Sequence, residues 1–145
     1  LDRLTHALRD IAGEMVVAQR PIRRGPRCEG GTGACGSFGV EPSLIFNEVR
    51  HPGVPLGKWL RNTLKEIERD LPSLHVIDVA QTRLGDVAAD VIWATRSLAV
   101  NLTQVEYLTL TESSGIILLF TCSSADFAAL NEQFAQCAQS LETEA

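Results

Sequence analysis

The sequence LTQVEYLTLTESSGIILLFTCSSADFAALNEQFAQCAQSL, residues 102–141, decides the fold. Its first half holds two runs rich in apolar and β-branched residues, 102–110 and 116–122, which predict strands joined by a turn at ESSG. From Phe127 to Leu141, apolar residues recur at spacings of three and four, which predicts a helix with one apolar side. The stretch therefore predicts an antiparallel hairpin followed by a helix that packs against it.

The ends of these elements carry further signals. The strand sequence GIILLFT is apolar at successive positions, so both of its faces need cover and we expect it at the centre of the sheet. Ser123 is expected to cap the last helix, and Asp126 falls in its first turn, where negative charge is favourable. Cys122 and Cys137 lie within apolar patterns, and we interpret both as core thiols.

Upstream of this stretch, the sequence predicts four more elements. Runs at 74–84 and 87–98, separated by a Gly-Asp turn, extend the hairpin into a meander of four antiparallel strands. Pro55 suits the first turn of a helix over 56–71, whose apolar residues form one stripe. The segment SLIFNEVRH at 43–51 predicts another strand.

The order of the elements defines the fold class. A run of strands with helices set apart is typical of an α+β sandwich rather than of alternating βαβ units. We expect an antiparallel β-sheet of about five to six strands with helices packed on it. Residues 1–36 are expected to form an N-terminal helix, a short strand and a flexible loop rich in Gly and Arg, and residues 37–145 the α+β domain.

The composition of the chain limits the classes of function that it can have. The chain has 145 residues, of which 45% are hydrophobic, and this is enough apolar material for one core. Its formal net charge of −5 argues against nucleic acid as a partner. No apolar run is long enough to span a membrane. The sequence does not begin with Met, so we expect a preceding segment, and we favour the cell envelope or secretion over the cytoplasm as its location.

Basic residues cluster in RPIRRGPR, which contains Arg20, Arg23, Arg24 and Arg27. This cluster is either a solvated loop or a docking patch for an acidic partner or an anionic membrane surface. Four Arg residues without interleaved aromatic residues are too few to indicate a nucleic-acid site.

The segment GTGACG, residues 31–36, has the G-x-G-x-x-G spacing of a dinucleotide-binding turn. Such a turn needs a strand before it and a helix that begins within it. Pro and Gly residues precede the segment, Gly39 and Pro42 prevent a helix after it, and Ser37 stands where a phosphate-binding loop needs Lys. The segment therefore does not indicate a nucleotide site, and we expect no cofactor.

Cys28 lies just before this segment and Cys35 lies within it. Six residues separate them, which is more than structural zinc sites use, and no second pair of ligands accompanies them. We therefore expect no metal site. The two thiols either stay free or close a disulfide in an oxidising compartment.

The sequence contains neither a G-x-S-x-G nucleophile motif nor the paired histidines of a zinc enzyme. Asp78, Asp90 and Glu106 fall on predicted strands between apolar neighbours, so alternation predicts that they lie on a solvent face. A hydrolase built from these carboxylates and a histidine is the rival interpretation. No catalytic residue is assigned, and we do not expect an enzyme.

The stretches PSLIFNEV (42–49), PLGKWLRNTLKEIERDLPSLHVID (55–78), TRLGDVAADVIWAT (82–95) and residues 102–141 together resemble the PsbP-like superfamily. The last stretch is the most informative, because it resembles the family's Q-x-x-Y strand, its G-x-[IV] strand and its D-F-x-x-L-x-x-x-F closing helix. The superfamily includes DcrB-like proteins, mycobacterial LpqN-like lipoproteins and the Eag chaperones of type VI secretion. Residues 1–36 depart from the usual opening of the family, a P-x-x-W segment and a first strand.

The resemblance implies an αβα sandwich that binds other proteins and has no catalytic residues to transfer. Some members are chaperones for hydrophobic segments, and others are lipoproteins or luminal subunits. Under this interpretation, Trp59, Trp93, Tyr107 and Phe120 either line an apolar sheet face for a partner or belong to the core. The sequence leaves open whether the chain forms a homodimer. It also leaves open an alternative function, in which the chain carries a small apolar ligand in the cell envelope.

Overall fold

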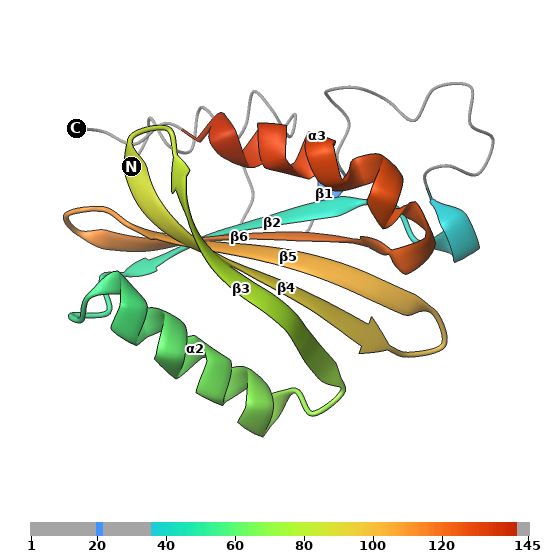
Figure 1. Ribbon diagram of the computed structural model, residues 1–145, viewed down its shortest axis with the longest axis horizontal. Helices are drawn as coiled ribbons and strands as arrows, with labels where there is room; N and C mark the ends of the chain where they lie inside the picture. The colour runs from blue at the N-terminus through green and yellow to red at the C-terminus, as the bar shows by residue number, and fades with distance from the viewer. Residues whose placement is uncertain (1–19, 22–35, 142–145) are drawn as a thin grey trace.

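The computed structural model describes residues 20–21 and 36–141, which form one antiparallel sheet and two α-helices (Figure 1). The strand order in the sheet is β1-β2-β6-β5-β4-β3. The elements are β1 (Arg20–Pro21), the 3-10 turn η1 (Ser37–Gly39), β2 (Ser43–Arg50), α2 (Leu56–Asp70), β3 (Leu74–Leu84), β4 (Val87–Ser97), β5 (Asn101–Leu110), β6 (Ser114–Ser123), the 3-10 turn η2 (Ser124–Asp126) and α3 (Phe127–Gln139).

The sheet is a meander with one strand added on its far side. Strands β3 to β6 pair consecutively and antiparallel, as the sequence predicts. Strand β2 pairs antiparallel with β6, so β6 lies in the interior of the sheet between β2 and β5. Helix α2 connects β2 to the opposite edge of the sheet, where β3 begins (Figure 1). The predicted central place of β6 is confirmed.

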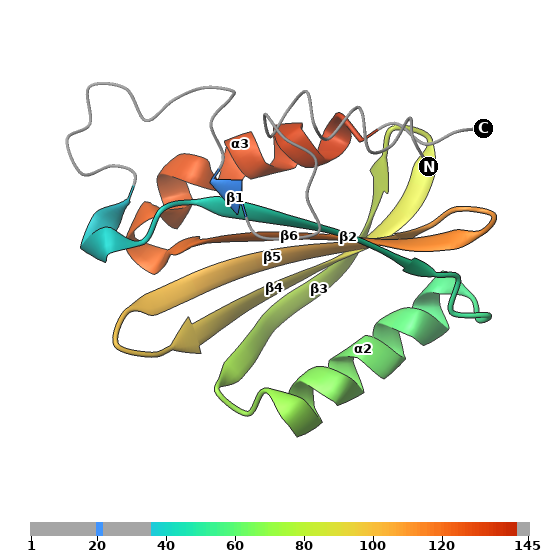
Figure 2. The same ribbon diagram turned by 180° about the vertical axis from the view of Figure 1, so that it is seen from behind.

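The two helices lie on opposite faces of the sheet, as Figures 1 and 2 show from both sides. Helix α3 covers one face, and α2 crosses the other face obliquely. The arrangement is an α+β fold with three layers, helix, antiparallel sheet and helix. The fold class predicted from the sequence is confirmed.

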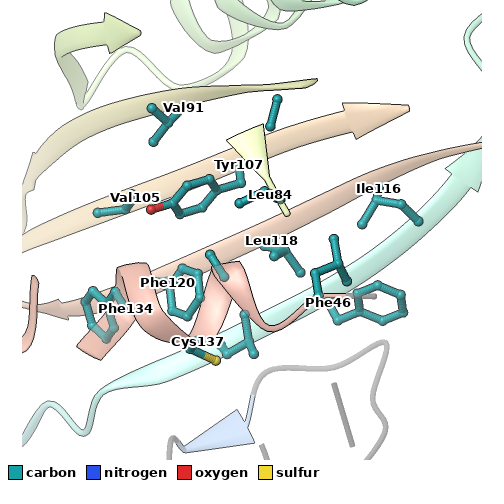
Figure 3. Packing of buried hydrophobic residues seen from close by; sticks show 14 of the residues in the cluster. Phe46, Leu84, Val91, Val105, Tyr107, Ile116, Leu118, Phe120, Phe134 and Cys137 are labelled. Carbon is teal, nitrogen blue, oxygen red and sulfur yellow. The ribbon is translucent and has the colours of Figure 1, made fainter. Parts of the chain in front are cut away.

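The larger core lies between the sheet and α3 (Figure 3). The ring of Phe120 is fully buried, stacks on Phe134 with 4.9 Å between centroids, and meets Tyr107 edge-on at 6.0 Å. Cys122 and Cys137 are free thiols in this core, and burial raises the pKa of each thiol to about 12. The interpretation of both as core thiols is confirmed.

A smaller apolar cluster lies between the sheet and α2. Ile67 of α2 packs with Ile92 of β4 and Leu108 of β5. Near the start of α2, the ring of Trp59 lies over Gly115 of β6, where a methyl group would come within 2.8 Å of the ring. The lack of a side chain at Gly115 therefore lets α2 approach the sheet.

The start of α3 differs from its prediction in one respect. The hydroxyl of Ser123 accepts a hydrogen bond from the N–H of Ala125 at 3.3 Å, in the predicted capping role. Asp126, however, is buried. Its carboxylate accepts two hydrogen bonds from Ser37, one from the backbone N–H at 2.9 Å and one from the side-chain hydroxyl at 2.6 Å. These bonds hold η1 against the start of α3. Hydrogen bonds to a carboxylate are among the stronger ones in proteins.

The contact between Trp59 and Gly115 yields a stability prediction. We expect Gly115→Ala to lower the free energy of unfolding by about 1 to 3 kcal/mol, because the added methyl group would clash with the ring of Trp59 where α2 packs on the sheet. Chemical denaturation monitored by circular dichroism would measure the change. Ser113→Ala, in the exposed turn that precedes β6, is the matched control and should change stability by less than about 0.5 kcal/mol.

A double variant makes this prediction specific. Trp59→Leu removes the ring that the new methyl would meet, so the effects of Gly115→Ala and Trp59→Leu should be less than additive. Strict additivity, or an unchanged stability for Gly115→Ala, would contradict the proposed packing.

Candidate functional site

The four aromatic residues that the sequence singles out lie on both faces of the sheet. Tyr107 and Phe120 are 8% and 0% exposed, respectively, and belong to the core beneath α3. Trp93 is half-buried and packs against that same core. Trp59 is half-buried on the opposite face, where it contacts the α2 cluster and Gly115. These side chains pack the two helices onto the sheet and do not converge on one surface.

The N-terminal candidates lie mostly outside the described residues. Arg20 and Pro21 form the two-residue strand β1, which pairs with Ser43 and Leu44 of β2. The basic docking patch and the disulfide stay predictions, because their remaining residues are not described: Arg23, Arg24, Arg27, Cys28 and Cys35.

The strand carboxylates do not share a solvent face, and the prediction from alternation was wrong for two of them. Asp78 is exposed, and its carboxylate accepts a hydrogen bond from the N–H of Val79 at 2.8 Å. Asp90 is only 2% exposed, and Glu106 is half-buried. Alternation shows which residues share a face of a strand, but it cannot show that α2 lies over part of that face.

The pairing of β4 with β5 fixes how Asp90 and Glu106 relate to each other. Asp90 is opposite Leu108 and Ile92 is opposite Glu106, so the four residues form a square on one face of the sheet. Ile92 and Leu108 occupy one diagonal and pack beneath α2. Asp90 and Glu106 occupy the other diagonal and therefore lie on opposite flanks of the helix. Only Asp90 of the two lines the pocket beside α2, whereas a shared acid–base site needs two groups that reach the same substrate atoms.

On the first flank, Asp90 lines a pocket of about 400 Å³ between the first turn of α2 and the hairpin of β3 and β4. Leu56 and Gly57 contribute from the helix, and Gln81 and Arg83 contribute from β3. The Oδ2 atom of Asp90 is buried, and no described residue donates a hydrogen bond to it. Burial raises the pKa of Asp90 above its usual value.

On the second flank, Glu106 lies between Ile92 of β4 and Leu119 of β6. Burial among these apolar side chains raises the pKa of Glu106 from 4.5 to about 7. Next to it on β5, the side chain of Gln104 donates a hydrogen bond to the hydroxyl of Thr121 at 3.3 Å. Glu106 therefore carries its proton for part of the time near neutral pH, in a mainly apolar setting.

The outermost strand β3 exposes apolar side chains together with its backbone edge. Among the described strands, β3 pairs with β4 alone. Its register shifts between Val76 and Asp78, which marks a β-bulge at Ile77. Ile77 is 62% exposed and Val76 is 39% exposed, while most of the large apolar residues of the sheet are buried. The sequence predicted the meander that begins with β3, but no local pattern indicates that β2 pairs with β6, which leaves β3 outermost.

Residues 20–21 and 36–141 offer neither a metal site nor a membrane-spanning helix. No group of three or more His, Cys, Asp or Glu residues in this part of the chain could hold a metal ion. No helix within these ranges combines the length and the apolar character that a membrane crossing requires.

The raised pKa of Glu106 predicts how stability depends on pH. The unfolded chain releases this proton at lower pH than the folded chain, so the ionised form of Glu106 destabilises the fold. Glu106→Gln should therefore raise the free energy of unfolding at about pH 8 by about 3 kcal/mol, since each pKa unit corresponds to about 1.4 kcal/mol. The gain should fall as pH decreases from about 7 to 4.5 and should vanish near pH 4.

Urea denaturation across this pH range would measure the effect, with Glu112→Gln in an exposed turn as the control. A gain of equal size at both ends of the range would contradict the shifted pKa.

The fold has known counterparts, although no protein-family model matches the sequence and no curated protein matches it significantly. The protein of unknown function PA94 from Pseudomonas aeruginosa is similar with a TM-score of 0.66 and 17% identity, over 72% of this chain and 74% of that chain. CyanoP, the PsbP of the cyanobacterium Synechocystis, is similar with a TM-score of 0.56 and 10% identity, over 72% of this chain and 68% of that chain.

A third counterpart is LpqN of Mycobacterium tuberculosis, a protein involved in cell envelope biogenesis. It is similar with a TM-score of 0.52 and 13% identity, over 76% of this chain and 65% of that chain. Similarity at such low identity concerns the fold alone. Together with the order of its strands and helices, these counterparts identify the chain as a protein with the PsbP-like fold.

Proposed function

We propose that this chain is a non-catalytic module that binds another protein in the cell envelope, and that it does so through the edge of β3 with which no described strand pairs. The observation that carries this proposal is the combination of an 11-residue outermost strand with exposed apolar side chains at Val76 and Ile77. An outermost strand offers unpaired N–H and C=O groups, which an extended segment of a partner can pair with.

The surroundings of this edge favour an apolar partner segment. Leu71 at the end of α2 is 38% exposed, and Leu98 after β4 is 54% exposed. Both residues lie at the end of the sheet where β3 begins, because Leu74 at the start of β3 pairs with Arg96 near the end of β4. The Nε atom of Arg96 also donates a hydrogen bond to the hydroxyl of Ser73 at 3.1 Å. Exposed apolar residues that gather beside a free strand supply side-chain contacts in addition to backbone hydrogen bonds.

A binding role agrees with the disposition of the carboxylates. Asp90 and Glu106 are separated by the diagonal of Ile92 and Leu108 beneath α2, so they do not support the hydrolase interpretation. The pocket at Asp90 combines apolar residues with the charged side chains of Asp90 and Arg83, which argues against a carrier of a purely apolar ligand. The likeness of the fold to LpqN, a protein of cell envelope biogenesis, supports an envelope location.

The proposal is tested with the variant Val76→Lys/Ile77→Lys, which places two charges on the free edge of β3. The partner is first captured from the native cells with the wild-type chain, then purified, and its Kd is measured by calorimetry. We expect the variant to raise Kd by at least about tenfold, which corresponds to about 1.4 kcal/mol. If the partner is a second copy, sedimentation velocity should show a wild-type dimer and a monomeric variant.

The matched control is Ala128→Lys/Ala135→Lys, which adds the same charges on exposed positions of α3. The control should bind the partner with unchanged Kd, and both variants should retain the circular dichroism spectrum of the wild type. Equal affinity of the β3 variant and the wild type would refute binding through this edge. Failure of the wild type to bind any protein stoichiometrically would refute the protein-binding role itself.

A further inference from the structure

The pocket beside α2 contains a polar group to which no described residue donates a hydrogen bond. Asp90 is 2% exposed, lines the pocket and has a buried Oδ2 atom without a donor among the described residues. A buried acceptor without a partner lowers the stability of the fold, and it does so more strongly when it is charged. A ligand that brings an N–H donor into the pocket would remove this cost.

The polar neighbours of Asp90 do not supply the missing donor. Gln81 stands directly opposite Asp90 in the pairing of β3 with β4, yet Oδ2 has no partner. Arg83 also lines the pocket, but its Nη2 donates to the carbonyl oxygen of Asp86 at 2.6 Å. The wall of the pocket therefore contains an acceptor that the described residues leave unused, beside the guanidinium group of Arg83, which donates to the hairpin turn.

The opposite wall of the pocket is the first turn of α2, which offers donors. The N–H groups of Lys58 and Trp59 both donate to the carbonyl oxygen of Pro55, at 3.0 Å each. The N–H groups of Leu56 and Gly57 precede them and have no acceptor within the helix. The N-terminus of a 15-residue helix also carries a partial positive charge, and Gly57 has no side chain to shield its backbone.

The pocket thus presents one negative and two positive features. A simple cation would gain from Asp90 but would also meet Arg83 and the positive end of α2. A simple anion would gain from Arg83 and the helix but would meet the buried carboxylate. A small ligand that carries an ammonium group and a carboxylate side by side complements both.

We propose that this pocket binds a free α-amino acid, with its ammonium group on Asp90 and its carboxylate at the N–H groups of Leu56 and Gly57 and the guanidinium of Arg83. The volume of about 400 Å³ is near the lower end for ligand pockets, which suits a molecule of this size. The site lies apart from Val76 and Ile77, so the inference is independent of the protein-binding proposal.

The test is a titration of the isotope-labelled full chain with each of the common L-amino acids at millimolar concentration, followed by proton–nitrogen NMR. We expect at least one amino acid to shift the backbone amide signals of Leu56 and Gly57 in a saturable manner. Asp90→Asn and Arg83→Gln should each weaken that binding by at least about tenfold. Asp78→Asn, which alters an exposed aspartate on the same sheet, is the control and should bind as the wild type does.

Three further ligands separate the contributions of the two charged groups. Acetate offers only the carboxylate, methylammonium offers only the ammonium, and trimethylglycine keeps both charges but has no N–H donor for Oδ2. Each should bind at least about tenfold more weakly than the best amino acid. The proposal is overturned if no amino acid binds, if acetate, methylammonium or trimethylglycine binds equally well, or if Asp90→Asn leaves the affinity unchanged.

Discussion

The apolar character of β6 on both of its faces is the constraint on which the rest of the structure depends. Phe120 and Leu118 belong to the core beneath α3, and Ile117 borders the cluster beneath α2. A central strand of this kind requires cover on both sides of the sheet. Helix α3 covers one side, whereas α2 must also carry the chain from β2 to the opposite edge at β3, so it crosses the second side obliquely and covers only part of it (Figure 1).

Partial cover of the second face explains the properties of its two carboxylates. A fully open face would leave Asp90 and Glu106 hydrated, and a fully covered face would leave no room for a ligand. Burial beside α2 raises the pKa of both residues, yet Asp90 gains no hydrogen-bond partner for Oδ2 among the described residues. The surroundings differ, since Asp90 faces the N-terminus of α2 and Arg83, whereas Glu106 lies among apolar side chains. Each flank of the helix therefore has its own chemistry.

The sequence predicted the elements and their order well, because hydrophobic periodicity reports on local structure. The predicted strand at 74–84 and the helix after Pro55 agree with the structure to within about a residue. The solvent face assigned to Asp90 was wrong, since alternation does not reveal which helix covers a face. The apolar stripe of α2 was the one signal in the sequence that part of a sheet face would be covered, because such a stripe must pack on a sheet. The bonds between Ser37 and Asp126 join residues 89 positions apart, and no local pattern indicates them.

The path of α2 across the sheet is the central claim, because it separates the two carboxylates and forms one wall of the pocket. Proton NOE spectroscopy of the chain would test it most directly. The account predicts strong NOEs from the indole protons of Trp59 to the α-protons of Gly115, and from the methyl groups of Ile67 to those of Ile92 and Leu108. Absence of NOEs from Trp59 to Gly115, together with absence of NOEs from Ile67 to Ile92 and Leu108, would contradict it.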